Sequence, residues 1–427
     1  MLIALRHRNF RLLWIGLLVS FSGTFMQSAA VLWHVSVLVP ADRRAIALGL
    51  VGLVRIVPVI LFSLISGVAA DAFDRRKLML VTQTIMAILA AVLAMLTFRG
   101  LTVVWPIYLL TAVSAAAGAF DLPARQALTP NLVPREHLPN AITLNSMMLQ
   151  TASVTGPAVG GLVLAAHGVG WVYAINAVSF AFVIGALLAM DPPRSDETDP
   201  ADRGNFTVSA ALEGLKFVFR APLIRSTMLL DFFATFFSSA TALLPIFAQD
   251  ILHVGARGYG WLYAAPAAGA LLTSAIMVRV VDWIERRGEV LIGAVAIYGL
   301  ATVAFGFSRV FWFSLLCLAA TGAADTVSTT FRNLIRQLET PDRLRGRMIG
   351  VNMVFFIGGP QLGELEAGLV ANWLGAVVSV VTGGFGCVAA TAAIAGVTPA
   401  LRAYRRQEMP ALPEEDDRSE GRAGEPA

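Results

Sequence analysis

Long apolar segments are the feature that most constrains how this chain folds. A helix needs about 20 mainly apolar residues to cross the ~30 Å hydrocarbon core of a bilayer. The segments are long and do not alternate apolar with polar residues, so strands are not expected. The sequence therefore predicts an all-α integral membrane protein with 12 transmembrane helices. The predicted spans are residues 12–39, 46–70, 78–98, 102–121, 140–166, 169–190, 222–248, 257–280, 289–308, 310–330, 347–372 and 374–396.

The composition supports this class. Charged residues make up 14% of the 427 residues and hydrophobic residues 57%, whereas soluble domains carry about 25% charged residues. So few charges cannot cover a water-facing surface, which excludes soluble, disordered and fibrous proteins. Cys317 and Cys387 lie far apart in apolar runs, so we expect neither a disulfide framework nor a metal site. No cofactor is predicted.

The N-terminal segment has one property of a signal peptide, because Arg6, Arg8 and Arg11 precede an apolar run. That run is longer than the apolar core of roughly 7–15 residues that signal peptides use. Further spans follow it along the whole chain. We therefore interpret the segment as the first span.

The positions of Lys and Arg predict the orientation in the membrane. If the N-terminus is cytoplasmic and each span crosses once, 26 of the 32 Lys and Arg residues lie on the cytoplasmic side and 5 lie outside. Cytoplasmic loops carry such an excess of positive residues. We expect a multi-pass protein of the bacterial cytoplasmic (inner) membrane with both termini in the cytoplasm. The formal net charge of +4 then reflects topology and does not indicate nucleic-acid binding.

The predicted spans divide into two sets of six. Residues 1–190 form an N-terminal half, 191–221 a cytoplasmic linker, 222–398 a C-terminal half and 399–427 a disordered tail. In the linker, Val208, Leu212, Leu215 and Phe219 have helical spacing, which predicts an amphipathic helix on the membrane surface.

The halves repeat an ordered series of residues. The first half carries Asp121, Pro134, Asn145, Gly156 and Gly160. Between 203 and 207 residues later, the second half carries Asp325, Pro341, Asn352, Gly359 and Gly363. Internal repeats are characteristic of secondary transporters, whose substrate site lies between the repeats near the membrane midplane.

Two motifs resemble those of the major facilitator superfamily. After span 2, Gly67, Asp71 and the pair Arg75-Arg76 match its loop motif, although Asp74 stands where Gly is usual. Span 5 carries a motif typical of antiporter branches of the superfamily. Its residues are Gly156, Pro157, Gly160 and Gly161. Three further segments, Arg8-Asn-Phe-Arg11, Gly260-Trp-Leu-Tyr263 and Thr340–Arg347, resemble the enterobactin-exporter and macrolide-efflux group of the superfamily. The resemblance implies two pseudo-symmetric six-helix halves around a central cavity.

Charged residues at the cytoplasmic mouth predict a gate whose contacts hold one face closed and break when the halves move. The alternative is ordinary positive-inside topology with loop capping. The predicted gate residues are Gly67, Asp71, Asp74, Arg75, Arg76 and Asp121, with Asp282, Arg286, Asp325 and Arg332 as their counterparts in the second half.

Polar stripes on spans 1, 4, 7 and 10 indicate the faces that line the cavity, because spacings of three, four and seven keep residues on one helical face. Hydroxyls in membrane helices also bond their own backbone, which is the alternative. The predicted cavity residues are Ser20, Thr24, Gln27, Thr111, Ser114, Gly118, Thr235, Ser238, Thr321 and Ser328.

Four ionisable residues lie deep in predicted spans, where they are costly and functional by default. Asp231, Glu364 and Glu366 are the candidates for proton coupling, because a carboxyl group removed from water can carry a proton. Arg55 and Glu364 lie at similar depths below the outer face, so we predict that they pair as an outer latch. Alternatively, Arg55 extends to the surface and Glu364 bonds within its own half.

These features predict a secondary exporter of small amphipathic molecules, drug-like or siderophore-like, driven by proton antiport. Its expected partners are the substrate, protons and the lipid bilayer, without nucleic acid and as a monomer. A membrane enzyme is disfavoured because no His-Glu-x-x-His metal signature is present. An ATP-driven pump is excluded because its phosphate loop needs Gly before Lys, whereas Lys77 and Lys216 follow Arg76 and Leu215. An uptake facilitator or a non-transporting sensor of the same fold remains the alternative.

Overall fold

The computed structural model describes residues 3–191 and 215–405. Within helices, the side chains at 63–64, 67–72, 342–343, 345–347, 349–350, 354 and 357 are not described. The described part of the chain is helical and contains no strand. Of the predicted linker helix, residues 215–220 are described and are helical, and the rest of that prediction lies outside the described residues, as does the tail beyond residue 405.

The N-terminal half consists of six long helices. Its helices are α1 (Arg8–Leu38), α2 (Ala41–Ala72), α3 (Arg75–Phe98), α4 (Trp105–Leu128), α5 (Leu138–His167) and α6 (Val169–Ala189). Short 3-10 turns η1 (Ile3–Arg6), η2 (Thr129–Leu132) and η3 (Arg135–His137) join them. Within this half α1 packs on α5 and α6, and α4 packs on α2 and α3.

The C-terminal half repeats the arrangement with one interruption. Its elements are α8 (Pro222–Phe237), η5 (Ala240–Leu243), α9 (Leu244–Ile246), η6 (Phe247–Ile251), α10 (Gly255–Val280), η7 (Val281–Trp283), α11 (Arg287–Phe307), α12 (Phe311–Glu339), α13 (Asp342–Leu374), α14 (Ala376–Val397) and α15 (Pro399–Arg402). The predicted seventh span is not one helix, because α8 ends at Phe237 and the chain continues as η5, α9 and the π-helical η6. The break falls at Ser238 and Ser239, whose backbones leave helical geometry.

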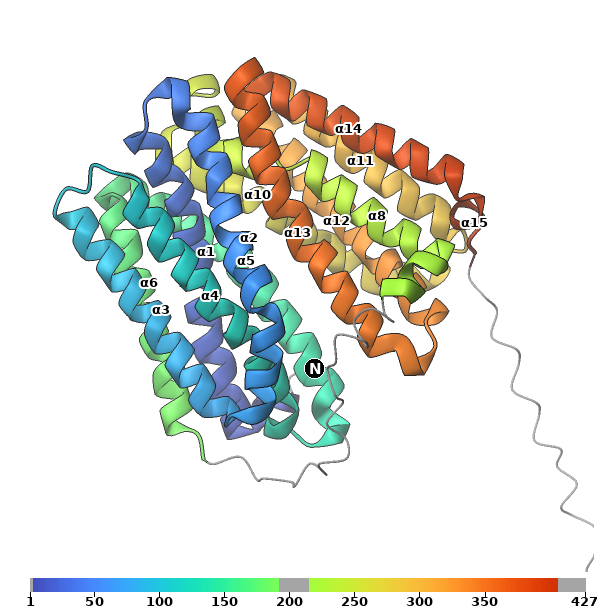
Figure 1. Cartoon of the computed structure of the whole chain (residues 1–427), viewed down its shortest axis with the longest axis horizontal. Helices are drawn as coiled ribbons and strands as arrows, with labels where there is room; N and C mark the ends of the chain where they lie inside the picture. The colour runs from blue at the N-terminus through green and yellow to red at the C-terminus, as the bar shows by residue number, and fades with distance from the viewer. Residues whose placement is uncertain (1–2, 192–214, 406–427) are drawn as a thin grey trace, which may run out of the picture.

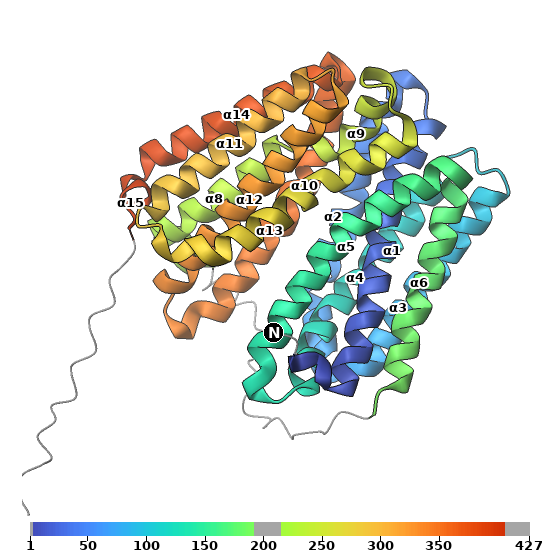
Figure 2. The ribbon, with the colours of Figure 1, turned by 180° about the vertical axis from the view of Figure 1, so that it is seen from behind.

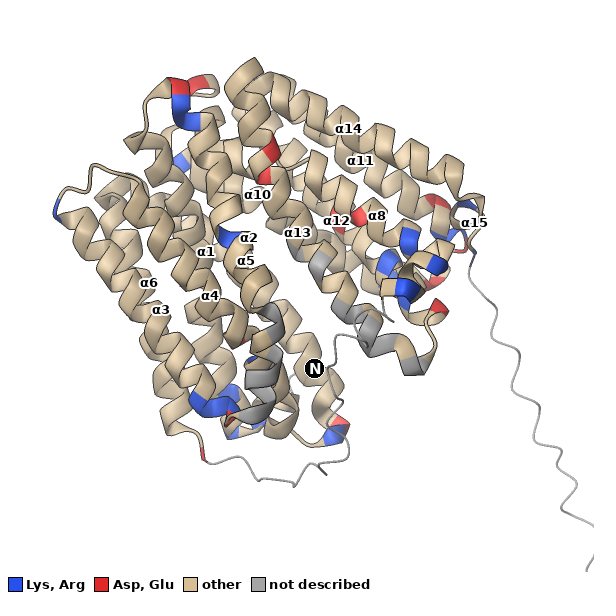
Figure 3. Cartoon of the chain, in the orientation of Figure 1, with Lys and Arg blue, Asp and Glu red and all other residues tan. Residues whose placement is uncertain are grey.

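Among the described residues, eleven helical segments are long and apolar enough to cross a membrane. Helix α13 occupies the place of the eleventh predicted span, residues 347–372, and completes the set of twelve. The fold is therefore the predicted all-α membrane architecture with two six-helix halves. Lys and Arg gather near the helix ends, while most of the middle of the molecule is free of charge (Figure 3).

The two halves meet at one end of the molecule and diverge toward the other (Figures 1 and 2). The largest apolar core draws residues from both halves, including Leu48 and Val172 from the first and Phe247 and Tyr259 from the second. We call this region the sealed end. At the opposite end, which we call the diverging end, each half has its own core: Phe10 and Met79 belong to one, and the second half has a separate cluster.

Candidate functional site

The largest contacts at the seam between the halves are two helix crossings, α2 with α13 and α5 with α10. At the second crossing, a Cβ atom added to Gly161 would lie 2.6 Å from the Cα atom of Gly260. At the first crossing, a Cβ atom added to Gly368 would lie 2.6 Å from the Cα atom of Gly49. Helices approach this closely only where small residues face each other. Glycine therefore permits backbone-to-backbone contact at both crossings.

The predicted span 5 motif supplies one side of this packing. A Cβ on Gly156 would lie 2.5 Å from the carbonyl oxygen of Ser22, and one on Gly160 would lie 2.5 Å from the Met26 side chain. Both contacts hold α5 against α1. Gly161 faces the other half at the same time, and Pro157 places its carbonyl oxygen against Gly260. The motif thus packs α5 on two neighbours at once.

Polar contacts reinforce the seam. The Tyr259 hydroxyl donates to the carbonyl oxygen of Ala29 at 2.8 Å, and Gln249 Nε2 donates to Ser36 Oγ at 2.7 Å. Arg44 Nη1 forms an ion pair with Asp250 Oδ2 at 2.7 Å. All hydrogen bonds and ion pairs between described residues of the two halves lie at the sealed end.

Arg55 and Glu364 lie near this seam. Glu364 is buried, and its carboxylate packs against Gly52 of α2. The Arg55 guanidinium interacts electrostatically with Glu364 and with Tyr263, although their charged atoms are not within ion-pairing distance. Its Nη2 donates a long hydrogen bond, 3.4 Å, to the carbonyl oxygen of Ser28. The structure thus brings the predicted latch residues into one region without joining them directly.

The predicted gate residues at the diverging end contact their own half. Asp74 caps α3, because its Oδ1 accepts hydrogen bonds from the backbone N–H groups of Arg76 and Lys77 at 2.9 and 3.2 Å. Arg75 and Arg76 donate to backbone carbonyls at the ends of α4 and α6. The side chains of Gly67 and Asp71 lie outside the described residues.

The second-half loop follows the same rule. Arg286 forms an exposed ion pair with Glu289 at 3.4 Å, within its own half. Asp282 lies in η7, which ends α10. In the conformation described here, the resolved contacts of these loops do not link the two halves.

Asp121 does not occupy the predicted position at a helix end. Helix α4 continues to Leu128, so Asp121 lies about two turns inside it. The carboxylate is buried and accepts hydrogen bonds from Thr82 at 3.0 Å and Gln83 at 2.9 Å on α3. Arg125, one turn further along α4, also interacts with it. The contacts described for this predicted gate residue therefore lie within the N-terminal half.

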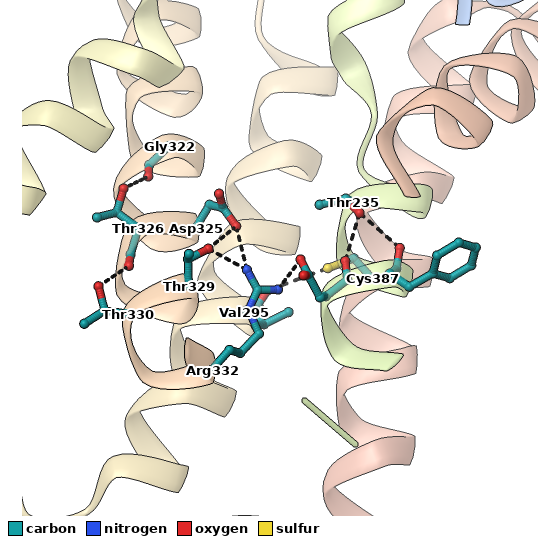
Figure 4. Close-up of polar contacts among 11 residues, drawn as sticks. Thr235, Val295, Gly322, Asp325, Thr326, Thr329, Thr330, Arg332 and Cys387 are labelled. Atoms are coloured by element: carbon teal, nitrogen blue, oxygen red, sulfur yellow. Dashed lines mark hydrogen bonds and ion pairs between the residues drawn. The ribbon is translucent and has the colours of Figure 1, made fainter. Parts of the chain in front are cut away.

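The most highly charged buried cluster described lies in the C-terminal half (Figure 4). Arg332 on α12, only 1% exposed, forms an ion pair with Asp231 of α8 at 2.5 Å and another with Asp325 of α12 at 3.2 Å. Its Nη2 also donates to Thr329 at 2.6 Å. Arg336, one turn beyond, is buried and interacts electrostatically with Asp231.

This cluster contains residues from two separate sequence predictions, Asp231 from the proton-coupling candidates and Asp325 and Arg332 from the gate. Asp231 was expected on a water-lined face as a proton carrier, but its side chain is 4% exposed and paired. Asp325 and Arg332 were expected in a gate at the helix end, but α12 extends to Glu339 and both lie inside it. The Asp325 side chain is 47% exposed, so it is the accessible acid of the cluster.

The predicted cavity residues divide into two groups. Thr24, Gln27, Thr111, Ser114, Gly118 and Thr235 are partly exposed, whereas Ser20, Ser238, Thr321 and Ser328 are buried. Several hydroxyls bond the backbone of their own helix, as the alternative interpretation held. Thr24 donates to Ser20, Thr235 to Asp231 and Thr321 to Leu318.

Solved structures of transporters share this fold. A bacterial homologue of the human lysosomal transporter Spinster, in an inward-facing and unoccupied conformation, superposes with a TM-score of 0.67 and 15% identity, covering 93% of this chain and 96% of that one. A bacterial homologue of the iron transporter ferroportin, in an inward-facing state, gives a TM-score of 0.66 with 19% identity over 93% and 99% of the two chains. A POT family transporter in complex with 5-aminolevulinic acid gives a TM-score of 0.71 with 11% identity over 92% and 96% of the two chains.

The family follows from the sequence comparison. A model of the transmembrane secretion effector family matches residues 1–416. This chain belongs to that family, within the major facilitator superfamily. It is therefore a membrane transporter and not an enzyme, and its substrate is a small molecule.

Curated relatives of this chain include enterobactin exporters. The enterobactin exporter EntS of Escherichia coli O1:K1 is 27% identical over 346 residues, which cover 80% of this chain and 81% of the relative. EntS of Shigella boydii serotype 18 is 28% identical over the same shares, and EntS of Citrobacter koseri is 27% identical.

Sequence reasoning missed the polar residues of the seam. Nothing in the sequence around them distinguishes these residues from other span or loop residues; they are Tyr259, Gln249, Arg44 and Asp250. Their partners are Ala29, Ser36 and one another, more than 200 positions away in the chain. A pattern within one span carries no information on contacts of that range.

Proposed function

We propose that this transporter exports small amphipathic organic molecules, drug-like or siderophore-like, by alternating access and proton antiport. The observation that carries the proposal is the asymmetry of contacts between the halves. Every described hydrogen bond and ion pair between them lies at the sealed end, while the diverging end has separate cores. A transporter that alternates must be able to exchange these two arrangements.

The excess of Lys and Arg supports placing the diverging end in the cytoplasm. Arg75 and Arg76 lie there, and η1, close to the N-terminus, packs on α5 in the same region. In this orientation the molecule receives substrate from the cytoplasm and releases it on the other side after the halves rock. The EntS relatives are enterobactin exporters, which supports this direction.

Transport itself is tested in everted membrane vesicles, where export from the cytoplasm becomes accumulation in the lumen. We use enterobactin and ethidium as probes, with and without a protonophore. Accumulation of at least one probe that the protonophore abolishes supports the proposal. Uptake by right-side-out vesicles instead would identify an uptake facilitator. Absence of transport in both orientations would favour a sensor.

Alternating access is tested at the seam. Arg44→Cys and Asp250→Cys are joined with a short bifunctional methanethiosulfonate, which a thiol reductant removes. The native Cys317 and Cys387 are buried, so the reagent favours the introduced pair. Cross-linking should stop transport, and reduction should restore it. The single-cysteine variants with the same reagent are the control. Undiminished transport by cross-linked protein would contradict a seam that opens.

The Arg55 and Glu364 latch belongs to the same proposal. Opening the seam would separate α2 from α13, and with them the two charges. Arg55→Glu and Glu364→Arg should each impair transport, and the double swap should restore part of it. Harmless single changes would leave Arg55 without a latch role. Glu366 is the alternative partner, since it lies two residues further along α13 and is partly exposed.

A further inference from the structure

A polar pocket lies inside the C-terminal half, apart from the seam. It has a volume of about 130 Å³ and is enclosed by η5, α10, α11 and α12 together with the end of α8. A buried polar space of this size has room for several water molecules. Its polar lining consists of Ser238, Thr241, Tyr298, Thr302, Thr321 and Asp325.

Asp325 connects this pocket to the buried charge cluster. Both of its resolved contacts, from Arg332 at 3.2 Å and Thr329 at 3.5 Å, end on the same carboxylate oxygen, Oδ1 (Figure 4). The other oxygen, Oδ2, takes part in neither of these contacts, and Asp325 is one of the residues that line the pocket. The Asp325 side chain is 47% exposed, whereas that of Asp231 on the opposite side of Arg332 is 4% exposed.

The surrounding charges also distinguish the two acids. Asp231 faces two guanidinium groups, because Arg332 pairs with it at 2.5 Å and Arg336 interacts with it electrostatically. Asp325 pairs with one guanidinium only among the described residues, because its Oδ1 lies 3.2 Å from Nη2 of Arg332. From the other helices packed around the cluster, Tyr298 of α11 and Cys387 of α14 are the remaining titratable groups.

We propose that this pocket is the proton-exchange site of the transporter and that Asp325 is the acid that exchanges the proton. The inference rests on proton antiport as proposed above. A hydronium ion in the pocket gives its proton to Oδ2 of Asp325 and leaves as water. The neutral acid no longer attracts Arg332, which remains paired with Asp231. Loss of the proton restores the second ion pair along α12.

This assignment differs from the sequence prediction, which named Asp231, Glu364 and Glu366 as the candidates for proton coupling. Asp231 instead acts as a positioning residue that holds Arg332 in place. Ser238 supports the assignment, because its buried hydroxyl meets the Cys387 thiol, a weak hydrogen-bonding group, but no nitrogen or oxygen partner among the described residues, and it lines the same pocket. A water molecule there can bond both the hydroxyl and the carboxylate, which would extend the proton path.

The first test needs no substrate. Purified full-length protein in nanodiscs is titrated from alkaline to acidic pH while infrared difference spectra record the C=O band of protonated carboxyl groups. Subtracting the Asp325→Asn spectrum from the parental spectrum should reveal one band, whereas Asp231→Asn should retain it. Loss of the band in Asp231→Asn or Glu364→Gln but not in Asp325→Asn would overturn the assignment.

A second variant covers the case in which Asp325→Asn fails to fold. Asp325→Glu keeps an acid at the same position and should shift the frequency of the band while preserving it. An unchanged spectrum in Asp325→Glu would show that the band belongs to another residue. Because these spectra are recorded without substrate, their outcome is independent of whether the export assay succeeds.

The second test uses everted vesicles with ethidium as the probe. Asp325→Asn should still equilibrate the dye down its own gradient and should lose accumulation against it, a drop to the level of protonophore-treated vesicles. Uphill transport by this variant at the parental rate would overturn the proposal. Loss of downhill movement as well would also count against it, because a coupling acid is not required for exchange along a gradient.

Discussion

The glycine crossing of α5 and α10 makes a direct prediction about conformational balance. We consider Gly161→Val, with Gly185→Val as the matched control. A Cβ at Gly161 meets backbone atoms of Gly260, Cα at 2.6 Å and N at 3.0 Å. At Gly185, a Cβ meets no atom within 4 Å. Both glycines lie within long helices, α5 and α6, so the change in helix propensity is similar at the two positions.

The magnitude follows from what must move. Backbone atoms at the crossing cannot rotate away as a flexible side chain would, so the helices must separate. Overpacking of a close contact costs ~1–3 kcal/mol, and replacing glycine in a helix returns ~0.5 kcal/mol. A net cost of about 1.5 kcal/mol lowers the population of the seam-closed state roughly 12-fold relative to any state in which these helices are apart. The control should gain slightly or stay neutral.

The assay is a distance measurement between spin labels. Labels at Arg43→Cys and His253→Cys report the sealed end, since both residues are exposed and flank the Arg44–Asp250 pair. Labels at Arg135→Cys and Leu338→Cys report the diverging end. Gly161→Val should lengthen the first distance and shorten the second. Identical distance distributions in the parent and in Gly161→Val, with equal thermal stability, would refute the claim that this contact excludes a side chain.

Three further predictions concern single contacts. Asp74→Ala should lower the free energy of unfolding by ~0.5–2 kcal/mol through loss of the α3 cap, whereas Asp74→Asn should keep the cap. Thermal denaturation of both variants tests this, and an equal loss in both would indicate that the negative charge itself is needed. Arg332→Leu should lower the free energy of unfolding by ~3–5 kcal/mol because it leaves Asp231 buried and unpaired. Adding Asp231→Leu to the same chain should recover part of the lost thermal stability, and no recovery would argue against the pair. Tyr259→Phe should weaken the sealed end by ~0.5–1.5 kcal/mol, seen as a broader distance distribution between the Arg43 and His253 labels and not between the Arg135 and Leu338 labels.

The sequence allowed prediction of the fold because hydropathy depends on the local chain. Each membrane helix must form all of its backbone hydrogen bonds internally, because hydrocarbon offers no partners. Its length can therefore be predicted from one continuous run of apolar residues. The interruption near Ser238 was missed for the same reason: the run remains apolar through the break. Helix ends were also placed too early in α4 and α12, because these helices continue beyond the apolar part into polar turns that hydropathy does not register.

The candidate site was predictable only where spacing within one helix decides it. Asp325 and Arg332 are seven residues apart, which places them on one face of α12, and the structure joins them. The pairing of Arg332 with Asp231 crosses 101 positions and depends on how α8 and α12 rotate about their axes. No local pattern specifies that rotation. Access of water to Asp325 and its absence at Asp231 depend on it too.

The seam crossings have a consequence for how such transporters diverge. At their tightest points, the two halves touch through main-chain atoms at Gly161 and Gly260 and at Gly49 and Gly368. Main-chain atoms are the same in every protein, so this joint does not depend on the chemistry of the side chains elsewhere in the molecule. Residues that select a substrate can therefore change over evolutionary time while the moving joint is inherited intact. New specificities need only keep these four positions and Gly52 small, since a Cβ atom on Gly52 would lie 2.5 Å from the carbonyl oxygen of Gln361 on α13.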